Sequence, residues 1–372
     1  MTKIPIILNY SHLHYQIGLT MLNRIGPIKA KKLMLKLNSV DELFLLSEKQ
    51  LVTKTGLTIK QIQSLKRKEA LEKAEKTYNY CVKNNIKCAF YTDKNYPQRL
   101  KNCVDSPLLI YATGAVKLNA EKIVSIVGTR NSTPYGEQIV KSLIQSFKGQ
   151  NITVISGLAL GIDTLVHKYC IAYGVPTVGV LGHGIDRLYP AQNIALAEQM
   201  KHLGGLISEF IPGTTPRPEN FPKRNRIVAG LAEATIVVES KLKGGSLITA
   251  NLANDYNRDV FAFPGSIHQE VSKGCNKLIH DQKAHLIQSP LDFLTLMNWQ
   301  SAERTVDYTS TLKSLSEIQK TIVDTLVKNQ LAQIDKISIE TTLPISKLNS
   351  ELFELEMEGV IKSHPGNRYS MA

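Results

Sequence analysis

The sequence predicts an α/β protein built around a Rossmann-like, doubly wound parallel sheet, with a helical domain before it and a winged helix after it. Three observations support this prediction. Apolar, β-branched segments alternate with helical segments between about residues 120 and 290. Short helical segments joined by glycine turns fill roughly the first hundred residues. The last sixty or so residues have the order helix, helix, helix, hairpin.

The N-terminal domain is expected to cover residues 1–104 and to be SAM-like or helix-hairpin-helix-like. NRIGPIKAKKLM places a Gly-Pro turn between two apolar segments, and KTGLTIKQIQSL is a looser copy. A glycine turn before a helix can offer backbone N–H groups to a phosphate, and Lys29, Lys31 and Lys32 add positive charge. A small helical packing domain explains the same pattern, so contact with DNA is one of two open interpretations.

Residues 105–299 are expected to form the Rossmann-like domain. Its strands are apolar and β-branched, and helical stretches such as YGEQIVKSLIQSF and TLVHKYCIAYG lie between them. This alternation is typical of a parallel sheet covered by helices on both faces. The predicted strands are KIVSIVG (122–128), ITVIS (152–156), PTVGVLG (176–182), GLISEF (205–210), ATIVVES (234–240) and DVFAFPG (259–265).

The C-terminal part is expected to be a polar linker at 300–311 and a winged helix at 312–372. The first helix of this domain presents Ile318, Ile322 and Leu326 on one face. The predicted recognition helix, ISKLNSELFELEMEG, is acidic, and DNA phosphates would repel it, so it favours contact with a protein. Its glutamates are Glu351, Glu354, Glu356 and Glu358.

The charge of the chain is unevenly distributed. The formal net charge is +13, and residues 1–111 hold 19 Lys and Arg against 8 Asp and Glu. Residues 300–372 hold 8 against 10 and are therefore slightly acidic. A basic chain suits a polyanionic partner such as nucleic acid, although solvated lysine-rich helices are common.

Other features of the sequence exclude several classes of protein. No stretch of 18 or more apolar residues predicts a membrane span, and the N-terminus does not have the pattern of a signal peptide. The cysteines are scattered, odd in number and without a C-x-x-C pair, which indicates a reducing, cytoplasmic compartment and no metal site. No cofactor is expected. The five cysteines are Cys81, Cys88, Cys103, Cys170 and Cys275.

The candidate site lies at the carboxyl ends of the strands, where open α/β sheets bind their ligands. Several strands are followed there by Gly- or Ser-containing helix starts, which let backbone N–H groups face an anion. Arg130, Lys223, Arg224 and Arg226 are expected to converge on this edge, which predicts an anion or phosphate-backbone site. One of the arginines could instead pair with Asp163 or Glu239. Phe221 could stack a base or anchor the core.

An ordered set of motifs resembles the DNA-processing protein A (DprA/Smf) family. The motifs are SIVGTRNSTPYG, SGLALGID, VLGHGIDRLYPAQN, LISEFIPG, FPKRNRIVAGL, GGSLITANLA and VFAFPGSI, within residues 105–290. The resemblance implies a cytoplasmic, dimeric bacterial protein that binds and protects incoming single-stranded DNA during natural transformation. It also implies help in loading a RecA-type recombinase, and no catalytic activity.

Carried over by position, the resemblance assigns strand-binding residues to four motifs. The GTR element contributes its Gly-Thr-Arg, the SGLA element a serine and two glycines, and GGS a glycine and a serine. FPKRNR is interpreted as a basic loop, and Arg217 could replace a base that some relatives have at Pro218. The predicted residues are Gly128, Thr129, Arg130, Ser156, Gly157, Gly161, Arg217, Phe221, Lys223, Arg224, Asn225, Arg226, Gly245 and Ser246.

Two enzyme classes compete with the binding interpretation. A Rossmann-like nucleotide phosphoribohydrolase needs carboxylates at one sugar, but GGSLITANLAN contains no Glu and Glu239 precedes it. A dinucleotide oxidoreductase needs G-x-G-x-x-G after the first strand, which is missing here. His167 and His183 have no orienting partner or ligand spacing in the sequence, so they are expected to be core or turn residues.

Overall fold

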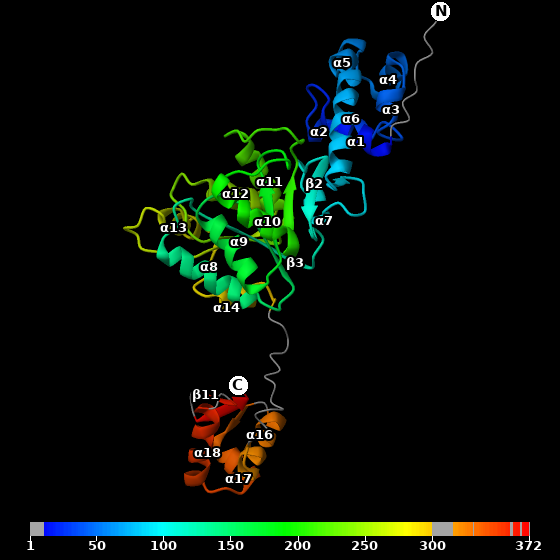
Figure 1. Cartoon of the computed structure of the whole chain (residues 1–372). Coiled ribbons are helices and arrows are strands. Elements are labelled where there is room, and N and C mark those ends of the chain that lie inside the picture. Colours follow the sequence, from blue (N-terminus) through cyan, green and yellow to red (C-terminus); the bar gives the residue numbers. More distant parts are fainter. Residues whose placement is uncertain (1–10, 300–314, 330, 358–359, 365–366, 372) are drawn as a thin grey trace, which may run out of the picture. The chain divides into compact units, whose positions relative to one another are not determined.

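The computed structural model describes residues 11–299, 315–329, 331–357, 360–364 and 367–371. It divides into two compact units, Met1–Gln300 and Ser301–Ala372 (Figure 1). The predicted linker at 300–311 lies outside the described residues. In the described part of the chain, no helix is both long and apolar enough to cross a membrane.

The first unit begins with a group of helices, as predicted. Glycines separate two pairs of them. Gly26 is the N-cap of α2, and Gly56 ends α4 in the left-handed conformation, with φ of 72°. The helices are α1 (His12–Thr20), α2 (Pro27–Met34), α3 (Glu42–Leu45), α4 (Glu48–Thr55), α5 (Ile59–Ser64) and α6 (Arg67–Lys83).

A nine-stranded sheet forms the centre of the first unit, in the order β1-β2-β6-β5-β4-β3-β7-β8-β9. In this spatial order, the seven strands from β6 to β9, which include β3, β4 and β5, are parallel to their neighbours. Strand β2 pairs antiparallel with β6, and β1 pairs antiparallel with β2. The strands are β1 (Lys87–Phe90), β2 (Leu109–Gly114), β3 (Lys122–Val127), β4 (Ile152–Ser156), β5 (Thr177–Leu181), β6 (Gly205–Ser208), β7 (Ala234–Val237), β8 (Asp259–Ala262) and β9 (His285–Leu286). The six predicted strands are confirmed as β3 to β8.

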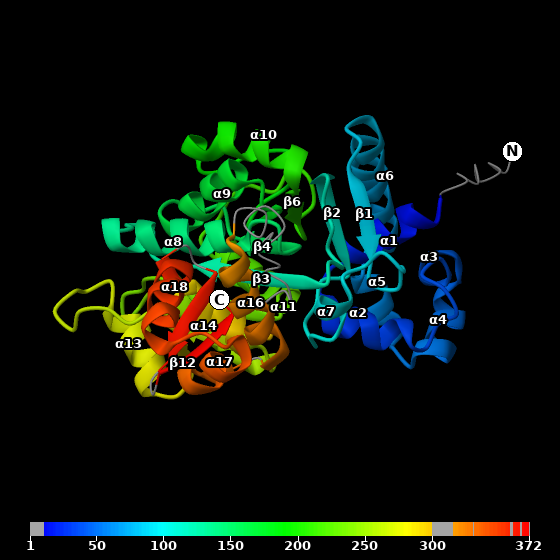
Figure 2. The same cartoon turned by 90° about the horizontal axis from the view of Figure 1, so that it is seen from below.

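Helices cover both faces of this sheet, which confirms the doubly wound fold (Figure 2). One apolar cluster packs α8 (Pro134–Phe147), α9 (Ile162–Tyr173) and α14 (Pro290–Leu296) on one face. A second cluster packs α7 (Gln98–Lys101), α11 (Asn220–Leu231), α12 (Gly245–Asp255) and α13 (Lys273–His280) on the other. The helix α10 (Ile194–Leu203) contacts β6 near the sheet edge.

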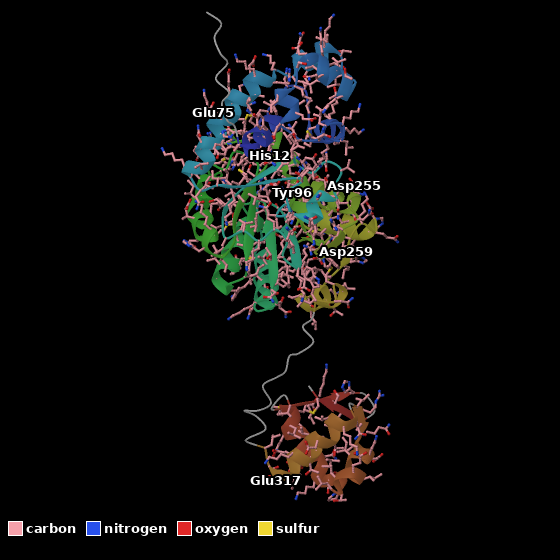
Figure 3. All side chains as sticks on the ribbon, turned by 90° about the vertical axis from the view of Figure 1, so that its right-hand side faces the viewer. His12, Glu75, Tyr96, Asp255, Asp259 and Glu317 are labelled. Carbon is pink, nitrogen blue, oxygen red and sulfur yellow. The ribbon has the colours of Figure 1, made fainter. Side chains whose placement is uncertain are left out.

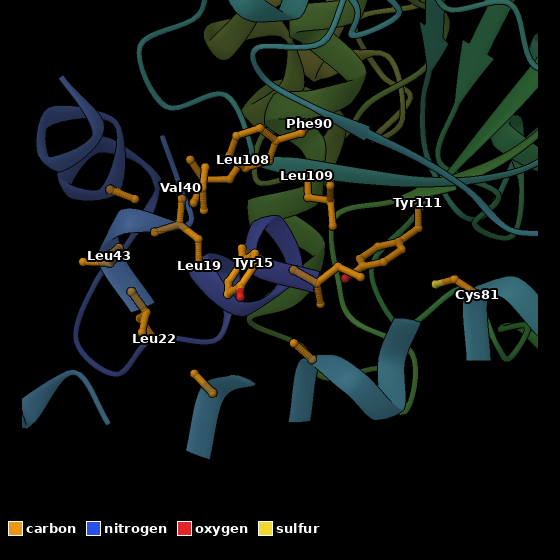
Figure 4. Packing of buried hydrophobic residues seen from close by; sticks show 14 of the residues in the cluster. Tyr15, Leu19, Leu22, Val40, Leu43, Cys81, Phe90, Leu108, Leu109 and Tyr111 are labelled. Atoms are coloured by element: carbon orange, nitrogen blue, oxygen red, sulfur yellow. The ribbon is translucent and has the colours of Figure 1, made fainter. Parts of the chain in front are cut away.

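Strands β1 and β2 connect the N-terminal helices to the sheet. Tyr15 and Leu19 of α1 share one apolar cluster with Phe90 and Tyr111 (Figure 4). Between these strands, Tyr96 (Figure 3) is buried and donates a hydrogen bond of 2.6 Å to the Pro107 carbonyl. The helical region therefore packs on an extension of the sheet, and the predicted boundary at 104/105 remains a prediction.

The second unit has the predicted order of a winged helix. Its elements are α16 (Glu317–Asn329), β10 (Leu331–Gln333), α17 (Ile334–Thr341), α18 (Ile345–Met357), β11 (Ile361–His364) and β12 (Arg368–Met371). The strands form a small sheet in the order β10-β12-β11. Ile322 and Leu326 of α16 are fully buried against Leu348 and Leu352 of α18, so helical periodicity identified this core correctly.

Candidate functional site

A hollow at the edge of the sheet lies where the chain reverses its winding direction. From β3 the strand order runs through β4 and β5 in one direction and through β7 and β8 in the other. Helices on opposite faces leave a crevice outside the carboxyl ends of β3 and β7. This hollow, the β3–β7 crevice, has a volume of about 650 Å³. The predicted residues that line it are Gly128, Thr129, Arg130, Gly157, Phe221, Arg224, Asn225, Gly245 and Ser246.

The FPKRNR segment is a helix, which corrects the prediction of a basic loop. It forms the first turns of α11 (Asn220–Leu231). Pro222 falls in the first turn, where its missing N–H costs nothing, and Ile227, Val228 and Leu231 bury one side of the helix. Successive side chains on a helix point about 100° apart, so the basic residues of this segment cannot all face one ligand.

Arg224 lies at the floor of the crevice and joins the loop after β4 to strand β5. It is only 4% exposed, and its Nη1 donates hydrogen bonds to the carbonyls of Gly157 and Val180. Burial lowers the pKa of Arg224 to about 10, and the nearby Asp163 carboxylate opposes this change. Asp163 accepts hydrogen bonds from the backbone N–H groups of Gly157 (3.1 Å) and Ala159 (3.3 Å). Arg224 therefore has a structural role beside Asp163 rather than an exposed one.

Arg226, Ser156 and Gly161 do not line the crevice, which corrects their predicted positions. Arg226 points to the other side of α11, where it pairs with Glu209. The Ser156 hydroxyl is fully buried and donates a hydrogen bond of 2.7 Å to Ile126. Gly161 has φ of 78°, and a Cβ atom there would lie 2.3 Å from the Thr129 carbonyl oxygen. Gly161 thus allows the loop after β3 to lie close to α9.

Arg130 and Phe221 form the exposed face of the crevice. Arg130 is exposed, and its Cζ atom lies 5.8 Å from the centre of the Phe221 ring. Arg224 lies on the same ring at 6.0 Å. A Cβ atom at Gly182 would lie 2.9 Å from Phe221, so the ring is seated on this glycine while part of it remains accessible. Both interpretations of Phe221, anchor and stacking surface, fit this position.

Three further residues of the crevice were not predicted. Tyr189 is 49% exposed, and its ring centre lies 6.0 Å from that of Phe221. Lys241 and Lys243 are exposed and line the crevice from the segment after β7. The position of the two lysines directly after a predicted strand could have indicated that they lie at the site. For Tyr189, the corresponding signal was the YP pair of the RLYPAQN motif. Arg217 and Lys223 are exposed but do not line the crevice.

The chemistry of the crevice suits a polyanion with exposed rings. Arg130, Lys241 and Lys243 offer positive charge. The only carboxylate among the lining residues, Asp163, is buried near Arg224. Charge-assisted hydrogen bonds from such groups recognise phosphate oxygens, and aromatic faces stack on bases. Glu239 does not line the crevice, because its carboxylate accepts hydrogen bonds from the Thr133 backbone N–H (3.0 Å) and hydroxyl (2.5 Å).

The two histidines singled out in the sequence are buried. His183 is 1% exposed, and burial lowers its pKa. His167 is fully buried, and its Nδ1 lies 2.8 Å from the Thr177 hydroxyl oxygen. Because that hydroxyl donates to the Val154 carbonyl, Nδ1 of His167 carries the proton. Its Nε2 has no hydrogen-bond partner among the described residues.

His167 is expected to make the protein less stable in mild acid. Burial lowers its pKa to about 3, whereas the unfolded chain protonates it near pH 6.5. Between these two pKa values the unfolded state binds a proton and the folded state does not. The free energy of unfolding therefore falls as the pH drops below 6.5. The expected loss is about 2 kcal/mol between pH 7 and pH 5. Urea unfolding at the two pH values measures it.

The His167→Asn variant is the test of this assignment, since an amide can keep the hydrogen bond to Thr177 without titrating. Its loss of stability between pH 7 and pH 5 should be about 2 kcal/mol smaller than that of the wild type. His280→Asn is the control, because His280 is exposed. Equal pH dependence of His167→Asn and the wild type would contradict the prediction.

Comparisons with known proteins find relatives of the chain. A sequence model of the family described as DNA recombination-mediator protein A matches residues 87–298, and one described as DprA winged helix domain matches residues 308–367. Protein Smf of Synechocystis is 33% identical over 310 residues, which cover 74% of this chain and 78% of that protein. The DNA processing protein DprA of Bacillus subtilis is 41% identical over 219 residues, with coverage of 59% and 72%.

Two solved structures are similar to the chain. The X-ray structure of DNA processing protein A from Streptococcus pneumoniae superposes with a TM-score of 0.65 at 32% identity and covers 76% of this chain and 97% of that one. DNA processing protein A from Helicobacter pylori, for which a single-stranded DNA binding mode is described, superposes with a TM-score of 0.52 at 26% identity. The second match covers 57% of this chain and 95% of that one.

Proposed function

Since the chain belongs to the DNA recombination-mediator protein A family, which includes the DprA and Smf proteins, we propose that its β3–β7 crevice binds and protects single-stranded DNA during natural transformation. The observation that carries this proposal is the combination of accessible cations and accessible rings in one hollow. Arg130, Lys241 and Lys243 contact the phosphates, and Phe221 and Tyr189 stack on bases. The DNA-binding role of the Helicobacter relative supports the same ligand.

The crevice selects single strands because its rings need unstacked bases. A duplex hides the faces of its bases, whereas a single strand presents them together with its phosphates. The contacts go to groups that every nucleotide shares, so the protein reads little sequence. Arg224 and Asp163 act only as the support that keeps the loop after β4 in place.

Titration of the full chain with labelled oligo-dT and with duplex of equal length tests the function. Oligo-dT should bind at least about tenfold more tightly than duplex, and its affinity should fall steeply between about 50 and 200 mM salt. Equal affinity for the duplex, or an affinity that salt does not change, would contradict the proposal.

The protein is further proposed to act without catalysis. The phosphoribohydrolase alternative would need accessible carboxylates in the crevice, whereas Asp163 is buried and Glu239 is bonded to Thr133 beside α8. Release of free base from a nucleoside monophosphate, abolished by Glu239→Gln, would favour the enzyme. Intact monophosphates and intact oligonucleotides after incubation are the expected result.

Two partners complete the proposed function. The chain acts in the cytoplasm as a homodimer and helps to load a RecA-type recombinase onto the bound strand, in agreement with the recombination-mediator description of its family. The winged helix serves a protein partner rather than DNA. Its helix α18 carries Glu351, Glu354 and Glu356, whose charge opposes contact with phosphates.

A further inference from the structure

A second basic hollow lies among the N-terminal helices, apart from the β3–β7 crevice. It is enclosed by α2, the turn between α4 and α5, and α5, and its volume is about 400 Å³. We name it the α2–α5 cavity. Its lining contains no Asp or Glu, and it shares no residue with the crevice. Its four cations are Arg24, Lys29, Lys32 and Lys36.

The charges of this cavity are largely unsatisfied within the described residues. Lys36 donates a hydrogen bond of 2.7 Å to the Thr55 carbonyl. The side chains of Arg24, Lys29 and Lys32 are exposed and have no hydrogen bond or ion pair in the described part of the chain. Like charges brought together without a counterion repel one another, and a bound polyanion relieves that repulsion.

The interior of the cavity is apolar, which favours a ligand that has an apolar surface as well as negative charge. Ile25, Leu33, Leu57 and Leu65 line it between the cations. A nucleotide of a single strand has both a charged phosphate and an apolar base face, and it fits such a mixed surface. The backbone of a duplex offers only phosphates and sugars to such a surface.

Helix α2 also lies close to the helix that borders the crevice. Lys31 of α2 donates a hydrogen bond to the Ser106 hydroxyl. Its pKa is lowered by burial and, next, by the charge of Arg226. Arg226 lies one helical turn after Lys223 on α11, whose first turn borders the crevice. Helix α2 therefore lies beside α11, where the charge of Arg226 is paired with Glu209.

We propose that the α2–α5 cavity is a second binding site for single-stranded DNA, which takes up a nucleotide of the strand beyond the segment held in the β3–β7 crevice. The inference rests on the proposed function, because it assigns both hollows to one ligand. Lys29 and Lys32 contact a phosphate, and Leu33 and Leu57 contact a base. The helix-hairpin-helix-like segment thereby has a role in extending the bound length of the strand.

The test compares short and long oligo-dT on the full chain, with lengths of about 6 and about 30 nucleotides. The double variant Lys29→Gln/Lys32→Gln removes two charges from the cavity and none from the crevice. It should bind the short strand like the wild type and the long strand about tenfold more weakly, with a salt slope lower by about one unit. Lys68→Gln/Lys73→Gln is the matched control, since both residues are exposed on α6 and line neither hollow.

Protection of lysines from acetylation supplies a second readout. The long strand should protect Lys29 and Lys32 in the wild type, whereas the short strand should leave them reactive. Normal binding of both lengths by the Lys29→Gln/Lys32→Gln variant, or full reactivity of both lysines with the long strand bound, would overturn the inference alone. Failure of the wild type to bind either strand would overturn the proposed function and the inference with it.

Discussion

Replacing Arg130 with alanine is expected to weaken the binding of single-stranded DNA by about ten- to a hundredfold. A charge-assisted hydrogen bond to a phosphate contributes about 1.5–3 kcal/mol, which corresponds to this loss of affinity. Arg130 is exposed at the mouth of the crevice, its guanidinium lies over the Phe221 ring, and it has no side-chain hydrogen bond or ion pair among the described residues. The variant should therefore melt at nearly the wild-type temperature.

Two further variants determine whether the effect of Arg130 is specific. Arg130→Lys should recover only part of the affinity, because an ammonium group cannot make two parallel hydrogen bonds to one phosphate. Lys141→Ala is the control, since Lys141 is an exposed cation on α8 that does not line the crevice. Fluorescence anisotropy and thermal unfolding should be measured on each protein. Unchanged affinity in a well-folded Arg130→Ala protein would remove Arg130 from the site.

Replacing Arg224 with methionine is expected to destabilise the first unit by about 3–5 kcal/mol, the usual cost of removing one partner of a buried charge pair. The substitution leaves the buried Asp163 without the opposing charge of Arg224. It also leaves the carbonyls of Gly157 and Val180 without this donor. DNA binding should be lost only as far as the fold is lost, and urea unfolding measures the change.

The double variant Arg224→Met/Asp163→Asn tests the cause of this destabilisation. The amide is neutral and still accepts the hydrogen bonds of Gly157 and Ala159, so the double variant should regain about 1–3 kcal/mol over Arg224→Met. A stable Arg224→Met protein that binds DNA poorly would instead make Arg224 a direct ligand of the strand. No gain in the double variant would argue against the charge pair.

The parallel strands were predictable because they are buried on both faces and therefore read as continuous apolar runs. Strand β1 was missed since KCAF is four residues long and has no alternation, and only its pairing with β2 makes it a strand. Strand β2 pairs antiparallel at the edge, outside the alternating pattern. Its place depends on tertiary contacts with the N-terminal helices, which local sequence does not contain.

The location of the site followed from a rule of sheet topology, whereas the roles of its residues depended on helical phase. The loops after β3, β4 and β7 do meet at one edge, as the carboxyl ends of parallel strands must. The separate roles of the residues in FPKRNR could not be predicted without knowing that this segment is helical. Once α11 is in place, Arg224 points to the floor, Lys223 to solvent and Arg226 to Glu209.

The most direct test of the β3–β7 crevice as the DNA site is to identify the peptides that ultraviolet light cross-links to bound oligo-dT. Thymine forms such links with side chains that it contacts, and aromatic rings that stack on bases are the expected positions. Links to Tyr189 and Phe221 are expected, with loss of the Phe221 link in Phe221→Leu. Cross-links confined to residues 315–371, with none at the crevice, would contradict this assignment of the site.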